Sequence, residues 1–309
     1  MAELIGIALA TYNGSQYITE MLDSIELQTF SYYHIHVTDD GSTDNTIATI
    51  KSHQLFIDGR ISIHEQQGGF GALRNFSRAI AYCNEEYILL CDQDDYWVNN
   101  KLELVFNKFK EAELSGGNVP LLVFSDLQIV DSNLSCIYES FFKSSIKDSR
   151  CSNPQDFIVS NHIPGCCMAI NASAKKVVMP IPEGIRMHDW WIALIVSTYG
   201  KIKYIDESLV KYRQHENNTI GVPGVGNKKF LQELMALKGV NKMIKNTTLL
   251  LTEYYSRVDA IKSNDGMLKS NELKKTYFFI SKLYFMANSY FGERILASLL
   301  IWSTIKLRK

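Results

Sequence analysis

The sequence predicts an α/β protein with a mostly parallel β-sheet flanked by helices, followed by a helical C-terminal region. In the first half of the 309-residue chain, short apolar runs alternate with segments of helical periodicity, as β-α-β units require. Three of these runs end in polar turns, where ligands bind in open α/β sheets. From about residue 228 onward, long helical patterns replace the alternation. We therefore expect a first domain over residues 1–225 and a helical region over residues 226–309.

Strands are expected where a short apolar run stops at polar or glycine residues: 4–10, 33–38, 61–64, 87–91 and the segment beginning at 121–124. Helices are expected where apolar residues recur every three or four positions: 18–27, a segment through residues 47–50, 73–81 and 101–109. Ser42 or Thr43 is expected to cap the second helix, and Asp44 is an alternative cap. The glycine-rich residues 68–71 precede the third helix, and residues 125–220 mix apolar runs with turn residues.

Composition narrows the class of protein. Hydrophobic residues at 46% and charged residues at 21% are typical of a globular chain. A net charge of -1 gives no support for nucleic-acid binding, so any affinity for phosphates must be local. The N-terminus reads as a first strand rather than a signal peptide, and the longest apolar run, 295–304, is too short to span a bilayer. The six cysteines lack metal-finger spacing, so we expect free thiols in the cytoplasm.

An acidic cluster follows the most apolar of the predicted strands. Asp92, Asp94 and Asp95 come directly after residues 87–91, and carboxylates so close together repel one another unless a cation is present. Hard cations such as Mg²⁺ bind carboxylate oxygens. The two-residue period of a strand places Asp92 and Asp94 on one face and turns Asp95 away. A surface turn with helix-capping aspartates is the alternative interpretation.

Two further polar segments end or follow predicted strands. Asp39 and Asp40 could accept hydrogen bonds from a base or a ribose; Asp39 fits a turn equally well, whereas Asp40 favours a functional role. Arg74 follows the glycine-rich loop near a helix start, where a phosphate or a base can bind. A solvated helix arginine explains Arg74 as well.

Two motifs in the second half of this region carry groups for proton transfer and anion binding. Asp189 lies between His188 and Trp190, and a half-buried carboxylate in such surroundings can act as a general base. The alternative, which is the more common role of such a motif, is a helix-capping aspartate followed by tryptophans of the core. Arg213 and His215 offer a cation and an imidazole close together, and His215 could bind a metal or a diphosphate. A structural histidine is the alternative.

Taken in order, these segments resemble family 2 glycosyltransferases of the GT-A type, and within them the bacterial rhamnosyltransferase-like branch. The matching segments are residues 11–14, 39–44, 69–75, 92–97, 188–190 and 212–215. They follow the family's order and cover roughly residues 4–220. The resemblance implies a Rossmann-like GT-A fold and inverting transfer of a sugar from dTDP-rhamnose or a UDP-hexose, with Mn²⁺ or Mg²⁺ as cofactor. The acceptor would be a hydroxyl of a surface polysaccharide or a lipid-linked glycan.

The resemblance also implies roles for individual residues. The donor would be bound by Thr11, Tyr12, Asn13, Asp40, Arg74, Asp92, Asp94 and Asp95. Asp40 would hold the base, Asp92 would face the ribose, and Asp94 would bind the metal together with His215. Asp189 would deprotonate the acceptor. His188, Trp190 and Arg213 would lie near the acceptor or the diphosphate. Leu73 departs from the family, which commonly has a small residue before the arginine.

Three questions stay open at this point. A nucleotide-sugar-binding module without catalysis is the main alternative, although aspartates at both 94 and 189 favour an enzyme. A dinucleotide-dependent oxidoreductase is disfavoured, because the first strand leads into TYNGSQY rather than GxGxxG. The basic amphipathic residues 293–309 fit a helix on a membrane surface, and they fit equally a helix that packs on the domain or on a second subunit.

Overall fold

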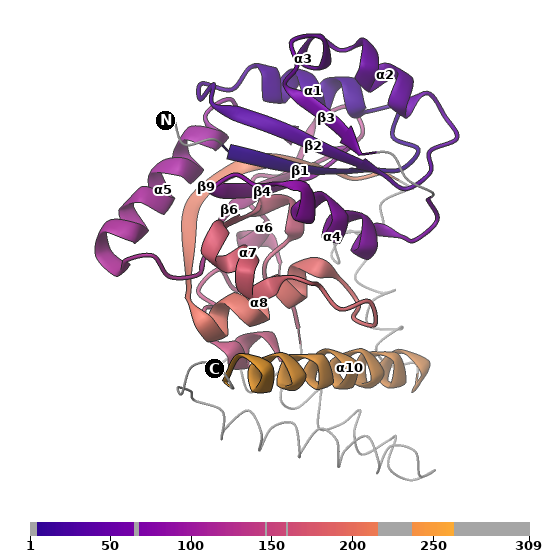
Figure 1. Ribbon diagram of the computed structural model, residues 1–309. Helices are drawn as coiled ribbons and strands as arrows, with labels where there is room; N and C mark the ends of the chain where they lie inside the picture. Colours follow the sequence, from indigo (N-terminus) through magenta and orange to yellow (C-terminus); the bar gives the residue numbers. More distant parts are fainter. Residues whose placement is uncertain (1–4, 65–67, 146, 159, 216–236, 263–309) are drawn as a thin grey trace. The chain divides into compact units, whose positions relative to one another are not determined.

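The computed structural model describes residues 5–64, 68–145, 147–158, 160–215 and 237–262 (Figure 1). The chain divides into two compact units, residues 1–183 with 187–222 and residues 184–186 with 223–309. The first unit contains the whole described sheet, and the helix described in the second is α10 (Leu237–Lys262). The predicted division at residue 225 stays a prediction. The predicted membrane or subunit helix at 293–309 lies outside the described residues.

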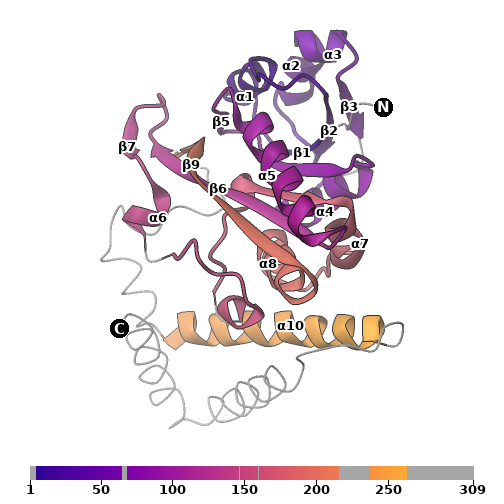
Figure 2. The ribbon, with the colours of Figure 1, turned by 90° about the vertical axis from the view of Figure 1, so that its left-hand side faces the viewer.

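The first unit is built on one mixed β-sheet. Its strands are β1 (Ile5–Thr11), β2 (Tyr33–Asp39), β3 (Ile61–His64), β4 (Tyr87–Asp92), β5 (Tyr96–Trp97), β6 (Leu121–Val130), β7 (Cys136–Tyr138), β8 (Met168–Asn171) and β9 (Lys201–Arg213). Their order among the described residues is β3-β2-β1-β4-β8-β6-β9-β5, with β7 paired to β6. Strands β3, β2, β1 and β4 are parallel, and β8 is antiparallel to both β4 and β6. Figure 2 shows the long parallel pair β6 and β9 side by side.

Helices cover both faces of the sheet. They are α1 (Ile18–Glu26), α2 (Thr46–Ser52), α3 (Gln54–Ile57), α4 (Ala72–Tyr82), α5 (Lys101–Gly116), α6 (Phe141–Ser144), α7 (Ala172–Val178) and α8 (His188–Tyr199), with short 3₁₀ turns at Pro154–Phe157 and Gly165–Cys167. Figure 1 shows α1 to α3 above strands β1 to β3 and α4 below them. Helix α4 packs on β1 and β2, while α5 packs on β6 and β9. The predicted α/β fold with flanking helices is confirmed.

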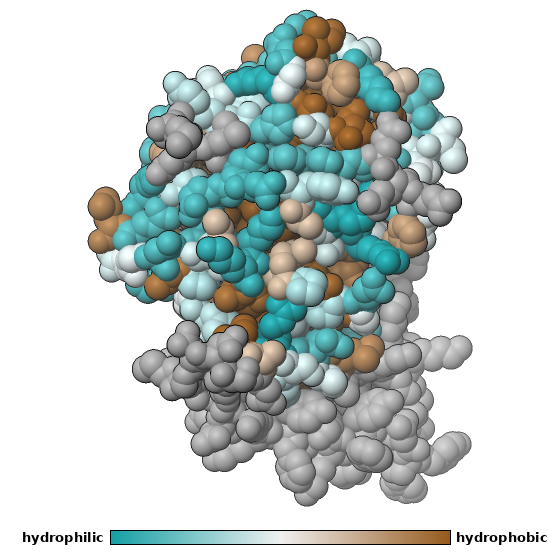
Figure 3. All heavy atoms as spheres, viewed as in Figure 1, coloured by the Kyte–Doolittle hydropathy of each residue, from teal (hydrophilic) through white to brown (hydrophobic). Residues whose placement is uncertain are grey.

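The core explains why these segments become strands. All seven residues of β1 and the first five of β4 are buried, as continuous apolar runs predict for central strands covered on both faces. The amphipathic α1 instead buries one stripe, which includes Ile18, Leu22 and Ile25. Hydrophilic residues dominate the face in Figure 3, where apolar side chains form small separate groups. Within the described residues, no helix is long and apolar enough to cross a membrane.

One local prediction is wrong. Helix α2 begins at Thr46, so neither Ser42 nor Thr43 caps it. The Ser42 hydroxyl instead donates to Asp39 Oδ1 at 2.6 Å and accepts the backbone N–H of Asn13 at 2.8 Å. Asn45 precedes the helix and makes no side-chain cap bond, while Asp44, the alternative, accepts the N–H of the first helical residue Thr46 at 3.0 Å from one position further back.

Candidate functional site

The carboxyl ends of β1, β2 and β4 meet at one edge of the sheet. Thr11 pairs with Asp39 on β2, and Ala10 pairs with Asp92 on β4. The Thr11 hydroxyl donates to Asp39 Oδ1 at 2.8 Å. The polar turns that the sequence places after these strands are therefore neighbours in space, as the parallel arrangement requires.

The loop after β1 is fixed by hydrogen bonds to the turns around it. Tyr12 and Gln93 are joined by two bonds, from the Tyr12 N–H to Gln93 Oε1 at 2.9 Å and from Gln93 Nε2 to the Tyr12 carbonyl at 2.8 Å. Asn13 adopts a φ of 46°, in the left-handed region that asparagine tolerates, and its Oδ1 accepts the N–H of Thr43 at 2.8 Å. The Tyr12 side chain is 54% exposed, so a flat aromatic surface is presented to solvent beside this edge.

Asp39 and Asp40 have different surroundings. Asp39 accepts the N–H groups of Gly41 and Ser42 at 2.9 and 2.7 Å, in addition to two hydroxyl groups, so it closes the turn. Asp40 reaches the glycine-rich loop, where its two oxygens accept the N–H groups of Phe70 and Gly71 at 3.0 and 2.7 Å. The structure thus shows Asp40 as an anchor for that loop. The predicted contact between Asp40 and a base stays a prediction.

Gly68 lies against the backbone of this turn. A Cβ at Gly68 would come within 2.0 Å of the Asp40 carbonyl oxygen, which cannot move without shifting the turn itself. We expect Gly68→Ala to destabilise the protein by about 1–3 kcal/mol, the usual cost of overpacking, and to weaken donor binding. Thermal unfolding with and without nucleotide measures both effects. Gly184→Ala, where a Cβ meets nothing within 4 Å, is the control; equal behaviour of the two variants would contradict the prediction.

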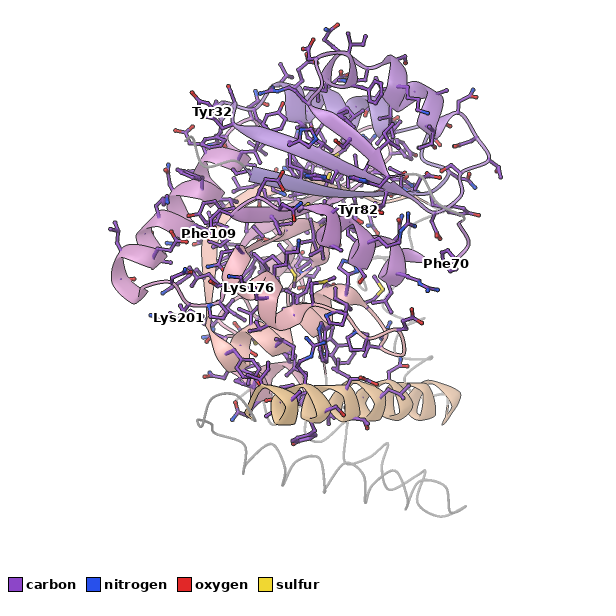
Figure 4. All side chains as sticks on the ribbon, in the orientation of Figure 1. Tyr32, Phe70, Tyr82, Phe109, Lys176 and Lys201 are labelled. Atoms are coloured by element: carbon purple, nitrogen blue, oxygen red, sulfur yellow. The ribbon has the colours of Figure 1, made fainter. Side chains whose placement is uncertain are left out.

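Arg74 is held beside the loop but stays accessible. Its guanidinium lies over the Phe70 ring at 4.3 Å and pairs with Glu183 at 3.2 Å, and its side chain is 47% exposed. Figure 4 shows Phe70 at the start of α4, with Tyr82 at the other end of that helix. Arg74 therefore keeps a cation at this edge of the sheet, in a position that fits the predicted contact with a base or phosphate.

The acidic cluster is not one continuous strand. Strand β4 ends at Asp92, and Gln93 and Asp94 form a turn, so the two-residue period does not extend to Asp94 and the predicted shared strand face is wrong. Desolvation, followed by the charges of Asp94 and Asp189, raises the pKa of Asp92 to about 7. Because Asp189 acts on Asp92, α8 and β4 bring their carboxyl groups together.

Asp94 and His215 are direct partners. His215 Nε2 lies 2.8 Å from Asp94 Oδ2, although 121 residues separate them in the chain. The His215 ring also packs on Tyr17, with ring centroids 4.9 Å apart. The two residues predicted to bind a metal together therefore meet in space.

Asp95 is fully enclosed. Its Oδ1 accepts the backbone N–H of Arg213 at 3.2 Å, and its Oδ2 has no hydrogen-bond partner among the described residues. Desolvation and the neighbouring carboxyl groups raise the pKa of Asp95 well above its usual range. Burial supports the predicted separation of Asp95 from the face that carries Asp94. A direct donor contact by Asp95 is not favoured by this position.

Arg213 also lies behind the cluster. Its side chain is 1% exposed, and its guanidinium donates to the Asp94 carbonyl at 2.8 Å, to the Ser132 carbonyl and to Glu20 at 2.5 Å each. It stacks over the Tyr17 ring at 4.5 Å. The enclosed guanidinium does not favour the predicted contact with acceptor or diphosphate. We infer instead that Arg213 positions the turn of Asp94.

His188 and Trp190 hold Asp189 from inside. His188 is 2% exposed and stacks on Phe76 at 4.1 Å, and burial lowers the pKa of its imidazole to about 3, so it is neutral. Trp190 is 5% exposed and donates from its indole to the Phe157 carbonyl at 2.5 Å. These positions do not favour the predicted acceptor contacts. Asp189 itself is only partly buried, and its Oδ1 accepts the N–H of Trp190 at 2.7 Å.

Three residues that support the candidate site were not predicted from the sequence. Lys101 is fully buried, donates to the Cys166 carbonyl at 3.0 Å, and lies 3.9 Å from the Trp97 ring, so it places a cation beneath the acidic cluster. Gly165 leaves room for the α8 motif, since a Cβ there would lie 3.1 Å from His188 Nε2. Gln93 ties two turns together. The sequence signals were weak, because a helix-start lysine, a lone glycine and a turn glutamine are common.

The residues at this edge fit a divalent cation. Ligand atoms of Asp92, Asp95 and Cys166 lie within 4.8 Å of one another, and Asp94 contributes a carboxylate beside the His215 imidazole. Burial first, and then the charges of Asp94 and Asp189, raise the pKa of Asp92, so a negative charge on Asp92 is disfavoured here unless a cation is present. Carboxylate oxygens suit Mn²⁺ and Mg²⁺, and an imidazole beside them favours a transition metal such as Mn²⁺ over Mg²⁺. Asp94 and His215 are the residues that we would expect to hold the ion.

A pH dependence follows from Asp92. Its folded pKa of about 7 lies above the ordinary value, so the unfolded chain loses this proton first and folded stability falls as the pH rises from about 4 to 7. Because a cation favours the ionised group, the stabilisation by Mn²⁺ should increase over the same range. Melting temperatures with and without Mn²⁺ at about pH 5, 6 and 7 test this, with Asp92→Asn expected to reduce the increase. An identical pH profile in that variant would exclude Asp92 as its source.

Comparison with known proteins adds independent findings. The model of glycosyl transferase family 2 matches residues 7–177. The dTDP-rhamnosyl transferase RfbG of Shigella flexneri is 32% identical over 225 residues, which are 69% of this chain and 73% of that protein. A UDP-Glc:alpha-D-GlcNAc-diphosphoundecaprenol beta-1,3-glucosyltransferase of Escherichia coli, WfgD, is 27% identical over 42% of this chain and 48% of its own.

Solved structures resemble the fold. TarS residues 1–349 of S. aureus, crystallised with UDP, has a TM-score of 0.55 at 16% identity, covering 92% of this chain and 71% of that one. A mannosyltransferase from Pyrobaculum calidifontis, with GDP-Man and Mn²⁺, has a TM-score of 0.51 at 14% identity, with coverage of 96% and 86%. At these identities the likeness concerns the fold, and it is the GT-A architecture predicted from the sequence.

Proposed function

The chain belongs to glycosyl transferase family 2 and is a glycosyltransferase that uses a nucleotide sugar, and we propose that it inverts the anomeric carbon in a single displacement. The donor is dTDP-rhamnose or a UDP-hexose, and the acceptor is a hydroxyl group of a growing surface polysaccharide or a lipid-linked glycan. Asp189 is the general base, and Asp94 and His215 bind a divalent cation.

One observation supports this proposal above the others. Three distant parts of the chain supply the groups at a single sheet edge: Asp92 at the end of β4 with Asp94 in the turn after it, Asp189 at the start of α8, and His215 after β9. His215 contacts Asp94 at 2.8 Å, and Asp189 lies near enough to raise the pKa of Asp92. A base on one side and cation ligands on the other are what a displacement at an anomeric carbon requires.

The chain's own groups carry the reaction as follows. Tyr12 contacts the nucleotide from the loop after β1, Arg74 contacts it from the first turn of α4, and Asp92 accepts a hydrogen bond from the ribose. Asp189 takes the proton of the acceptor hydroxyl while the oxygen of that hydroxyl forms a bond to the anomeric carbon. The bond from that carbon to the diphosphate oxygen breaks at the same time, and the diphosphate leaves with the electron pair. When bound, the cation neutralises charge that develops on the departing diphosphate.

The donor is best tested by binding. The similarity to a dTDP-rhamnosyl transferase favours dTDP-rhamnose over the UDP-hexoses. We expect dTDP-rhamnose with Mn²⁺ to raise the melting temperature more than UDP-Glc, UDP-GlcNAc or GDP-Man, since a ligand that binds only the folded state stabilises it. A larger shift with a UDP sugar would overturn this donor assignment while leaving the reaction class intact.

A turnover measurement tests the class of acceptor and whether the protein is catalytic. The Escherichia coli relative is named for transfer to a diphosphoundecaprenol-linked sugar, which supports a lipid-linked acceptor here. Release of dTDP from dTDP-rhamnose should rise when a polyprenyl-diphosphate-linked sugar is added. Donor binding without release of dTDP, with or without such acceptors, would instead support a binding module that lacks catalysis.

A further inference from the structure

A second cluster of metal-ligating side chains lies away from the candidate site, around His36 on β2. Because side chains alternate along a strand, His34 and His36 point to the same face of the sheet. His36 Nδ1 lies 3.2 Å from His64 Nε2. The His64 ring in turn stacks on Tyr82 at 3.7 Å, and Figure 4 shows Tyr82 at the end of α4. One nitrogen of His36 is thus occupied, and the ring is held in place.

The other nitrogen of His36 faces two more potential ligands. His36 Nε2 lies 3.0 Å from Glu85 Oε1, and the Glu85 side chain is 10% exposed. Glu85 Oε2 is enclosed and has no hydrogen-bond partner among the described residues. The Cys83 thiol is fully buried, and the ligand atoms of His36, Cys83 and Glu85 all lie within 4.8 Å of one another. A buried carboxylate group with one unpartnered oxygen therefore lies beside an imidazole and a thiol.

We propose that His36, Cys83 and Glu85 form a second metal site, separate from the one beside Asp94, which binds Zn²⁺ or a cation of similar ligand preference. Imidazole nitrogen, thiolate and carboxylate oxygen are the ligands of zinc in proteins. His64 acts on the remaining nitrogen of His36, in the way that outer partners fix the orientation and tautomer of metal-bound histidines. The distances between ligand atoms require only small side-chain movements to converge on one ion.

The backbone leaves room for this arrangement. Gly6 on β1 lies beneath it, and a Cβ there would come within 2.5 Å of Glu85 Oε2 and 3.2 Å of the Cys83 Cβ. The three ligands come from β2, from the residue after α4 and from the segment before β4. His36 precedes Asp39 by three residues of extended strand, about 10 Å. The cluster therefore does not share ligands with the candidate donor site, and its metal would join three elements of the sheet.

Neighbouring groups hold the Cys83 thiol in place. The thiol donates to the Ala79 carbonyl at 3.3 Å, and burial raises its pKa well above its usual range. The cationic or titratable groups that face the cluster are His34, His64, Arg78 and Lys175.

Cobalt is the probe that tests the site in the full-length protein. In the background Asp94→Ala, which removes the carboxylate ligand of the other proposed metal site, Co²⁺ should produce a thiolate-to-cobalt charge-transfer band. Adding Cys83→Ser should abolish the band. Cys136→Ser is the matched control, because Cys136 is an exposed thiol 3.3 Å from the carboxylate of Glu139 and belongs to no cluster of three metal-ligating side chains among the described residues. This variant should keep the band.

A second measurement distinguishes the loss of a metal ligand from misfolding of a variant. Glu85→Gln keeps the shape of the side chain and should lower the affinity for Zn²⁺ at least about tenfold, as loss of even an outer partner does. Zn²⁺ should raise the melting temperature of the Asp94→Ala protein and should do so less when Glu85→Gln is added. Absence of the charge-transfer band, its survival in the Cys83→Ser protein, or its loss in the Cys136→Ser protein would each overturn the proposal.

Discussion

Replacing Asp189 with asparagine should lower kcat by about 10²–10⁴-fold, the range that a general base contributes, and leave donor affinity nearly unchanged. The amide keeps the size of the side chain and can still accept the N–H of Trp190, so the start of α8 should stay in place. It cannot take a proton from an acceptor hydroxyl. Steady-state turnover of dTDP-rhamnose with an acceptor, together with calorimetric titration of the donor, separates the two effects.

The matched control for this variant is Asp206→Asn. Asp206 is an exposed residue of β9 whose carboxylate meets the Tyr204 hydroxyl at 3.3 Å, so the same chemical change is made away from the site. Its turnover should equal that of the unmodified protein. If the Asp189→Asn protein turned over at the same rate as this control, Asp189 would not be the base.

Replacing Asp94 with alanine should remove the part of donor binding that depends on a divalent cation. Loss of an outer partner of a metal costs about 10–100-fold in affinity, so loss of a ligand should cost at least as much. Calorimetry with and without Mn²⁺ measures this directly. The unmodified protein should bind the donor more tightly with Mn²⁺, and the variant should bind it equally weakly in both conditions.

His215 provides the companion test for Asp94. Because His215 Nε2 lies 2.8 Å from Asp94 Oδ2, the two side chains should act as one unit, and combining His215→Ala with Asp94→Ala should add little to either change alone. Asp126→Ala is not a suitable control, since that buried carboxylate accepts hydrogen bonds from the Ser140 hydroxyl and the Phe141 N–H at the start of α6. Glu207→Ala, at an exposed position on β9, is preferable. Mn²⁺-dependent binding that persists in the Asp94→Ala protein would exclude the metal role.

Periodicity and turn residues were sufficient to predict strands β1 to β4, the start of β6 and helices α1, α2, α4 and α5, but not the short elements α3, β5 and β7. The strand at Ile61–His64 begins and ends where the sequence predicts, because an apolar run bounded by polar residues has few other ways to be buried. Prediction was poorer for strand order. The antiparallel insertion of β8 between β4 and β6 depends on long-range pairing that no local pattern contains.

In the candidate site too, some features could be predicted from the sequence and others depend on contacts between distant parts of the chain. Asp94, Asp189 and His215 could be selected because each carries a chemical group that the reaction needs. Whether a selected residue faces the ligand or supports it from behind depends on burial that the sequence does not reveal. Arg213 illustrates this, since its enclosure results from contacts with Glu20 and Ser132, far away in the chain. His188 is similar, because its stacking on Phe76 joins two helices.

The contact between His215 and Asp94 has a consequence for how the protein folds. It closes a loop of 121 residues, and β5 pairs with β9 over a comparable separation in the chain. Chains dominated by such distant pairings fold slowly, because the entropy of closing long loops is lost before the contacts form. The parallel strands β1 to β4 can assemble from nearer neighbours. We therefore expect nucleotide-binding structure to precede the complete cation site during refolding, with catalytic competence as the last property to return.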